Sequence, residues 1–169
     1  MSRWLRRRQC IWRLVLAFFV PVFVLGVVGC ELLPATSTAA DTVRVARVVD
    51  GDTIVISTGE YVRYIGMDTP EMSSIPEPYA KAATEANRQL VEGKIVRLEK
   101  DVSETDRYGR LLRYVWVDGT MVNRELVQRG LAEAKAYPPD TRYQPLLEAA
   151  EVEARLAGRG IWSPAAAAP

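Results

Sequence analysis

Residues 42–65 read TVRVARVVDGDTIVISTGEYVRYI, and this stretch decides the fold of the chain. Three short segments within it, Thr42–Val49, Thr53–Ser57 and Tyr61–Ile65, are rich in the β-branched and aromatic residues that favour strands. An Asp-Gly pair and a Gly-Glu pair separate the segments, and such pairs are typical of tight turns. The stretch therefore predicts three consecutive strands joined by hairpin turns.

The chain beyond this stretch predicts one helix, two more strands and two further helices. The first helix is expected over Pro78–Leu90, the strands over Lys94–Glu99 and Arg110–Val117, and the later helices over Met121–Arg129 and Tyr143–Leu156. Five short strands with a helix after the third fit a small OB-type barrel. We therefore expect an α+β fold that is mainly β, a five-stranded OB-type barrel with three added helices.

The first 29 residues have the composition of an export signal. They hold five arginines and no acidic residue, and an apolar run extends from Leu14 to Val28. The run ends Val27-Val28-Gly29-Cys30, which resembles a bacterial lipobox. We expect residues 1–29 to be a signal peptide and Cys30 to carry the lipid that anchors the protein to a membrane, with an uncleaved membrane anchor as the alternative. Both interpretations place the rest of the chain outside the cytoplasm, in a bacterial cell envelope.

The remaining chain divides into a tether, one domain and a tail. Small residues and a proline over residues 30–41 predict a tether, and SPAAAAP at residues 163–169 predicts a flexible tail. The folded domain is expected over residues 42–162. We find no internal repeat in the sequence. No protein partner is evident from it, and we expect a monomer.

Histidine is absent from the 169 residues, which excludes several kinds of active site. Neither a Ser-His-Asp triad nor a histidine-based zinc site can form. Cys10 lies in the expected signal peptide and Cys30 at its end, so the domain can hold no disulfide and no thiolate metal site. Catalysis would have to use carboxylates, arginine, lysine, tyrosine or a metal ion held by oxygen.

The chain after the expected signal peptide is mildly acidic. Five of the 22 basic residues lie in the first 29 positions, which leaves 17 basic against 21 acidic residues and a net charge of −4. A broad basic surface for nucleic acid is therefore not expected. Any anion site must be local or must recruit a cation.

Two acidic segments each have a structural and a chemical interpretation. Asp50-Gly51-Asp52-Thr53 is typical of a hairpin turn, but its carboxylates also suit Ca²⁺ or Mg²⁺. In Arg63-x₄-Asp68-Thr69-Pro70-Glu71, Asp68 and Glu71 have the spacing of a helix cap and its partner. Alternatively, Asp68 supplies a second metal oxygen and Glu71 acts as a base. Arg63 shares its strand face with an apolar residue, so it either points into the barrel mouth or caps the face at an edge.

A third segment, Asp106-Arg107-Tyr108-Gly109-Arg110, is either a solvated charged turn or a phosphate-binding loop. In the second interpretation the arginine offers a rigid fork of donors to a phosphate, and Tyr108 stacks or donates a hydrogen bond.

Together, and in this order, the three segments resemble the staphylococcal nuclease (thermonuclease) family. The resemblance extends from about Val45 to Trp162 and includes Gly130-Leu131-Ala132 and the closing Ile161-Trp162. It implies the family's fold, an OB barrel with three helices.

The resemblance also implies roles for individual residues. Asp52, Asp68 and the backbone carbonyl of Thr69 match the family's Ca²⁺ ligands, and Asp50 matches an acid that lies near the metal, mostly through water. Glu71 matches the carboxylate assigned as general base.

The basic residues match the family's substrate contacts. Arg63 and Arg110 match its two phosphate-binding arginines, Tyr108 matches a tyrosine that contacts the substrate, and Arg107 beside it is expected to bind substrate as well. The implied activity is calcium-dependent hydrolysis of DNA and RNA to 3′-phosphate products. A non-catalytic, nucleic-acid-binding OB-fold lipoprotein is the alternative. Residues 72–78 form a short loop poor in lysine, where the nuclease that gives the family its name has a longer basic loop. This difference leaves the preference between DNA and RNA open. Tyr137 is assigned no role.

Overall fold

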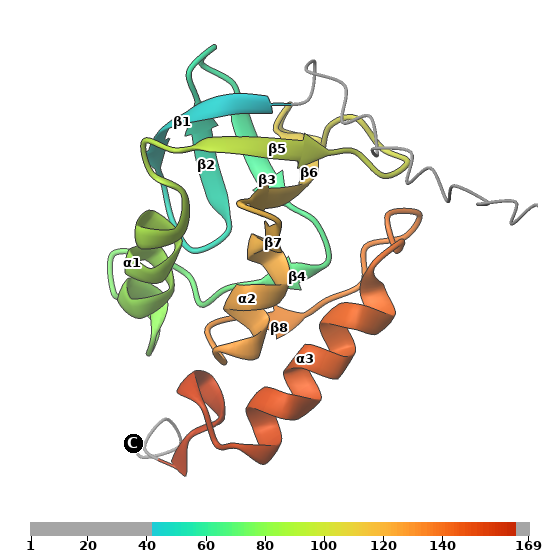
Figure 1. Cartoon of the computed structure of the whole chain (residues 1–169). Helices are drawn as coiled ribbons and strands as arrows, with labels where there is room; N and C mark the ends of the chain where they lie inside the picture. Colours follow the sequence, from blue (N-terminus) through green and yellow to red (C-terminus); the bar gives the residue numbers. More distant parts are fainter. Residues whose placement is uncertain (1–41, 165–169) are drawn as a thin grey trace, which may run out of the picture. The chain divides into compact units, whose positions relative to one another are not determined.

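A computed structural model describes residues 42–164 of the chain (Figure 1). The expected signal peptide (1–29), the expected lipidation site Cys30 and the tether (30–41) lie outside the described residues, as does most of the expected tail. Within residues 42–164, no helix combines the length and the apolar character that crossing a bilayer requires.

The five expected strands are present and close into a barrel. They are β1 (Thr42–Val48), β2 (Thr53–Ile56), β3 (Tyr61–Tyr64), β5 (Ile95–Glu99) and β6 (Leu111–Val117). Neighbouring strands pair antiparallel in the order β3-β2-β1-β5-β6, and β3 closes the barrel by pairing in parallel with β6. Figure 1 shows β1 and β5 crossing the upper part of the molecule, with the helices below. The prediction of an α+β fold built on an OB-type barrel is therefore confirmed.

The alternation of side chains along the strands builds the barrel core. Val62 and Tyr64 of β3 are 0% and 1% exposed, whereas Arg63 between them is only partly buried. Ile54 of β2 and Val96 of β5 are also buried in this core. Removing these apolar side chains from water stabilises the barrel. Arg63 lies on the opposite face of β3 and is not part of this core.

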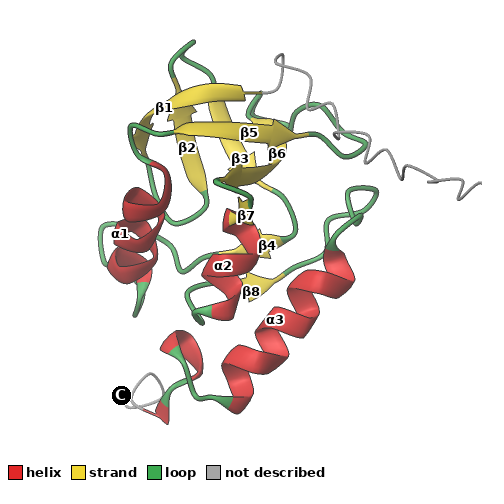
Figure 2. Cartoon of the chain, viewed as in Figure 1, coloured by secondary structure: helices red, strands yellow, loops and turns green. Residues whose placement is uncertain are grey.

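Three helices and a short 3₁₀ helix cover one end of the barrel (Figure 2). They are α1 (Ala80–Val91), α2 (Val122–Gln128), α3 (Gln144–Leu156) and η2 (Gly160–Trp162). In α3 the buried residues Leu147, Ala150 and Ala154 recur at helical spacing, so one face of the helix packs on the domain. Helix α2 contacts both α1 and α3.

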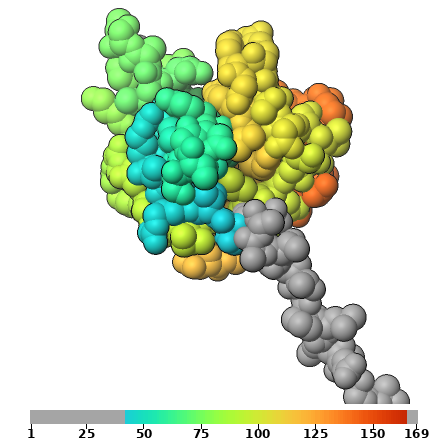
Figure 3. Space-filling view, turned by 90° about the horizontal axis from the view of Figure 1, so that it is seen from above, coloured from blue at the N-terminus to red at the C-terminus, as the bar shows by residue number. Residues whose placement is uncertain are grey.

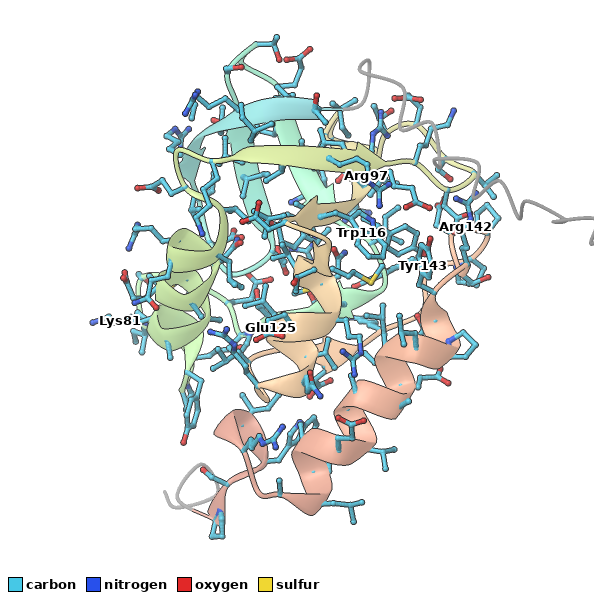
Figure 4. The ribbon with its side chains drawn as sticks, viewed as in Figure 1. Lys81, Arg97, Trp116, Glu125, Arg142 and Tyr143 are labelled. Carbon is cyan, nitrogen blue, oxygen red and sulfur yellow. The ribbon has the colours of Figure 1, made fainter. Side chains whose placement is uncertain are left out.

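A row of aromatic rings fixes the start of α3 to the barrel. Tyr143, directly before α3, packs edge-on against Tyr114 and Trp116 of β6, with ring centroids 4.8 and 5.9 Å apart. The guanidinium of Arg97 on β5 lies over the ring of Trp116, 4.7 Å from its centroid. Figure 4 shows Arg97, Trp116 and Tyr143 following one another at this junction.

Three two-residue strands complete the fold, and one of them corrects a prediction. They are β4 (Met67–Asp68), β7 (Thr120–Met121) and β8 (Glu133–Ala134), and β4 pairs antiparallel with β8. The interpretation of Asp68 as a helix cap is therefore wrong, because Asp68 lies in β4 opposite Glu133. The expected helix start at Pro78 is also wrong. Tyr79 has a left-handed φ of 68°, which an α-helix does not accommodate, and α1 begins at Ala80.

Two glycines hold the C-terminal segment against the end of α2. The N–H of Ile161 donates to the carbonyl of Gly130 at 2.8 Å. A Cβ at Gly160, where φ is +53°, would lie 2.0 Å from that same carbonyl oxygen. This backbone contact therefore requires a residue without a side chain at position 160.

We expect Gly160→Ala to lower the free energy of unfolding by about 2–4 kcal/mol, because the methyl group forces two backbone segments apart. Urea denaturation of the parent and the variant measures the difference. Gly93→Ala is the matched control, since Gly93 also has a positive φ (+74°) but no atom within 4 Å of the added Cβ. Equal losses in the two variants would show that only backbone strain, and not the close approach, matters at Gly160.

Candidate active site

The turn between β1 and β2 carries the first acidic group of the site. The N–H groups of Val49 and Asp50 donate to the carbonyl of Thr53 at 2.9 and 3.4 Å, which closes a hairpin turn. The same turn buries Asp52, which is 1% exposed, and the Asp52 N–H donates to Asp50 Oδ1 at 3.1 Å. The two interpretations of this segment are therefore compatible, because the hairpin turn itself brings the carboxylates together.

Asp52 accepts hydrogen bonds from several groups. Thr53 Oγ1 donates to Asp52 Oδ1 at 3.0 Å, while the N–H and Oγ1 of Thr69 donate to Oδ2 at 3.2 and 3.0 Å. Burial raises the pKa of Asp52 to about 6, and the neighbouring charge of Asp50 acts in the same direction, against the lowering effect of Arg63 and Thr69. A nearby positive charge therefore stabilises the ionised form of this buried carboxylate.

Arg63 supplies one such charge by bridging two carboxylates. Its Nη1 pairs with Asp52 Oδ1, and its Nη2 lies 2.5 Å from Asp68 Oδ1. The Arg63 side chain is only 16% exposed, so this fork is held in one orientation. Of the two orientations that the sequence allowed, Arg63 therefore has the one directed toward the barrel mouth and the acidic residues.

The second oxygen of Asp68 binds Lys135, a residue that sequence reasoning missed. Lys135 Nζ lies 2.7 Å from Asp68 Oδ2, and its backbone N–H donates to the carbonyl of Gly66 at 2.9 Å. Lys135 directly follows β8, and the pairing of β4 with β8 brings it to Asp68. Two residues are too few to show an alternating pattern, so no sequence signal could have predicted this contact.

Beside Arg63, a cavity of about 400 Å³ opens between loops that are distant in the sequence. Arg63, Arg107, Tyr108 and Arg110 are among the residues that line it. Figure 3 shows the segment around residue 75 in green and the segment around residue 107 in yellow projecting from the same side of the molecule. The fold thus places three of the predicted substrate-binding side chains in one cavity with Arg63.

Asp106 organises the basic loop. Its Oδ1 accepts the N–H groups of Tyr108 and Arg110 at 2.9 and 3.0 Å, and its Oδ2 lies 2.7 Å from Arg110 Nε. Arg107 lies over the Tyr108 ring, 4.7 Å from the centroid. The segment is therefore a hydrogen-bonded charged turn, and this turn orients Arg110 toward the cavity.

Tyr137 and Asp140 also line the cavity, although no pattern in the sequence predicts them there. Both lie in the segment between β8 and α3. The buried Asp140 accepts the N–H groups of Val102 and Ser103 at 2.9 and 2.7 Å, so it joins this segment to the loop after β5.

Glu71, the expected general base, lies in the exposed loop that follows Thr69 and Pro70. Its backbone N–H donates to Glu77 Oε2 at 2.9 Å, and its carbonyl accepts the N–H of Glu77 at 3.1 Å. Its carboxylate makes no hydrogen bond or ion pair within residues 42–164, and it does not line the cavity beside Arg63. Glu71 is therefore close to Asp68 in the sequence, but its carboxylate forms no ion pair with Arg63 or Arg110.

The acidic residues offer the donors that a hard cation requires. Asp52 and Asp68 each bind one end of the Arg63 guanidinium, so the two carboxylates converge, and the adjacent carbonyl of Thr69 offers a third oxygen. Among the described residues no three acidic side chains group closely enough to hold an ion by themselves. A cation here would complete its shell with backbone and water oxygens, which suits Ca²⁺ or Mg²⁺.

Comparisons with known proteins show the family to which the chain belongs. The sequence profile described as staphylococcal nuclease homologue matches residues 61–164. The chain belongs to the staphylococcal nuclease family. It is 42% identical over 134 residues to the thermonuclease of Staphylococcus intermedius, which covers 76% of this chain and 80% of that protein. It is 41% identical over 128 residues to the thermonuclease of Staphylococcus hyicus, covering 72% of this chain and 76% of that protein.

A further member of the family, the endonuclease YncB of Bacillus subtilis (strain 168), is 42% identical over 129 residues, which is 72% of this chain and 61% of that protein. The resemblance seen in the sequence is therefore confirmed. The chain is an enzyme of the nuclease class, a hydrolase.

Gly51 provides a direct test of the contact between Asp52 and Thr69. A Cβ at Gly51 would lie 2.7 Å from Thr69 Oγ1, so Thr69 must move away from Asp52 in Gly51→Ala. We expect nuclease activity on DNA to fall about tenfold or more, because the acidic residue loses its orientation. Gly59→Ala, in the turn between β2 and β3, meets nothing within 4 Å and serves as the control. An unchanged rate in Gly51→Ala would contradict the importance of this contact.

The contribution of Asp140, which lines the cavity, to stability can be tested through its dependence on pH. Burial acts to raise its pKa, but the stronger effect of hydrogen bonds from Ser103 and Val102 leaves the pKa below its ordinary value of 3.8. Since the pKa is lower in the folded state, the carboxylate stabilises the fold above about pH 4 and loses this effect as the pH falls further. We expect Asp140→Asn to cost about 1–3 kcal/mol at pH 7 and less at pH 3, measured by urea unfolding. A loss that is the same at both pH values would contradict this assignment.

Proposed function

We propose that this chain is a calcium-dependent nuclease that hydrolyses the phosphodiester bonds of DNA and RNA to 3′-phosphate products. One observation supports this most strongly: Asp52 and Asp68 converge on Arg63, and Arg63 lines the same cavity as Arg110 and Tyr108. Acidic oxygens for a cation and arginines for a phosphate thus lie side by side. We also propose that the protein acts in the cell envelope, held to the membrane by lipid on Cys30.

Asp52, Asp68 and the carbonyl of Thr69 would hold the Ca²⁺ ion, with Asp50 close by. When bound, Ca²⁺ would neutralise part of the phosphate charge and polarise the phosphoryl oxygen. The hydrogen bonds that Asp52 Oδ2 accepts from the N–H and Oγ1 of Thr69 hold these two residues together before any cation arrives.

The basic residues act on the phosphate. As a water molecule attacks the phosphorus and the bond to the 5′-oxygen breaks, negative charge builds up on the phosphoryl oxygens, and the guanidinium groups of Arg63 and Arg110 would stabilise it. The 5′-oxygen leaves as a hydroxyl group after it takes a proton from solvent. Asp106 keeps Arg110 oriented, and the two acidic residues do the same for Arg63. Losing one such donor lowers the rate by about 10²–10³-fold in comparable sites.

Glu71 takes the proton of the attacking water in this proposal. It is exposed and forms no ion pair with a described residue, so its carboxylate is available as a proton acceptor. Tyr108 and Arg107 line the same cavity, where they would contact the nucleic acid beyond the scissile phosphate.

The test is cleavage of labelled single-stranded DNA, duplex DNA and RNA in Ca²⁺ and in excess chelator. We expect 3′-phosphate fragments only with Ca²⁺. We expect Glu71→Gln and Arg110→Ala each to reduce the rate by at least about 10²-fold with the fold intact, because each removes a group used in the transition state.

Glu85→Gln, a change on the exposed face of α1, is the control and leaves the rate unchanged. Near-parental rates in Glu71→Gln or Arg110→Ala would overturn the roles given to them. Binding of nucleic acid without cleavage under any divalent ion would instead indicate a non-catalytic binding protein.

A further inference from the structure

A buried chain of hydrogen bonds connects α1 to the acidic turn. The hydroxyl of Tyr64 on β3 donates to Asn87 Oδ1 at 2.9 Å, and Asn87 Nδ2 donates to the carbonyl of Asp50 at 3.0 Å. Tyr64 and Asn87 are 1% and 0% exposed, so both side chains lie entirely within the protein. Each polar group of this pair has a partner, and the pair ends on the turn that carries Asp50 and Asp52.

The same tyrosine also fixes the other end of the turn. The backbone N–H of Tyr64 donates to the carbonyl of Asp52 at 2.9 Å. The carbonyls of Asp50 and Asp52 are therefore both bound, one by α1 and the other by β3. Gly51 between them closes against Thr69 without room for a side chain. With its backbone held at three points, the turn has little freedom to move its carboxylates.

The packing of α1 alone does not account for Asn87. The helix buries Ala83, Ala86 and Val91 on the same side, and an apolar residue at position 87 would extend that face. Asparagine has a low helix propensity, and burying its amide is costly unless both ends are hydrogen-bonded. Both ends are bonded here, and the donor end serves the acidic turn.

We propose that Asn87, supported by Tyr64, is a positioning residue of the active site. It holds the carbonyl of Asp50 and thereby sets the geometry in which Asp50 and Asp52 meet a divalent cation. This role rests on the proposed function, because it concerns the cation that the nuclease uses. Partners of this kind, which do not bind the ion themselves, commonly change metal affinity by about 10–100-fold when removed.

The decisive variant is Asn87→Leu, which has a similar size and a better helix propensity but cannot donate to Asp50. We expect titration calorimetry with Ca²⁺ alone to show affinity weakened about tenfold or more. In the absence of metal, we expect faster hydrogen exchange of the Asp52 amide. Tyr64→Phe removes the hydroxyl that supports Asn87 but leaves the bond from Asn87 to Asp50, so we expect a loss of Ca²⁺ affinity that is smaller than the loss in Asn87→Leu.

Asn123 of α2 offers a matched control. It is also 0% exposed, accepts the N–H of Val115 and donates to the carbonyl of Ile65, both at 2.9 Å. We expect Asn123→Leu to reduce stability at least as much as Asn87→Leu while leaving Ca²⁺ affinity within about threefold of the parent, because it does not touch the turn. If Asn87→Leu does not fold, Asn87→Ser replaces it, since a serine hydroxyl is too short to reach both partners.

Unchanged Ca²⁺ affinity in a folded Asn87 variant would overturn the positioning role, and so would an equal loss in Asn123→Leu. A parent protein that binds no Ca²⁺ and cleaves nothing would defeat the proposed function instead. In that case the exchange rate of the Asp52 amide decides the role of Asn87 by itself, and an unchanged rate in Asn87→Leu would contradict it.

Discussion

The buried carboxylate of Asp52 is the constraint on which the rest of the site depends. An ionised group that is 1% exposed is tolerated only if it is paired and hydrogen-bonded. Its partners come from three different places: Thr53 on β2, Arg63 on β3 and Thr69 after β4. The hydrogen bonds and the ion pair of Asp52 can therefore form only when the barrel is closed and the β4 segment is in place. The formation of the site is thus coupled to the formation of the fold.

The two sides of the site differ in chemistry. One wall presents Arg107, Tyr108 and Arg110, whereas the projecting loop before α1 is acidic and exposes apolar side chains, with Ile75 84% exposed. A protein with an acidic domain can attract a phosphate only where such a local group of arginines outweighs the rest. The fold concentrates the basic residues at the cavity beside the acidic pair, which reconciles the overall charge with an anionic substrate.

The sequence predicted the barrel well because strand alternation and turn residues are local signals. The strands and helices lie within a few residues of their expected bounds, and the strongest periodic segments were the most accurate. The convergence of Asp52, Arg63 and Asp68 could be expected only through the family resemblance, since no local rule states which loops meet. The start of α1 was misplaced because nothing in the sequence shows that Tyr79 adopts a left-handed backbone conformation.

Lys135, Tyr137 and the support from Asn87 escaped prediction for a related reason. Lys135 reaches Asp68 through a pairing of two-residue strands, which leave no pattern in a sequence. Asn87 lies on the buried face of α1, where its amide has no identifiable partner until the β1–β2 turn is placed beside it. Residues that position a site without belonging to its sequence motifs are determined by tertiary packing, which a single sequence does not show.

The most direct test of the central role of Asp52 is thermal unfolding as a function of Ca²⁺ concentration, in the parent and in Asp52→Asn. A ligand that binds only the folded state stabilises it by about 2.7 kcal/mol at a concentration 100 times its Kd. We expect the Tm of the parent to rise steadily with Ca²⁺ and the Tm of Asp52→Asn not to rise. A parent Tm that ignores Ca²⁺, or an equal rise in Asp52→Asn, would contradict this central role.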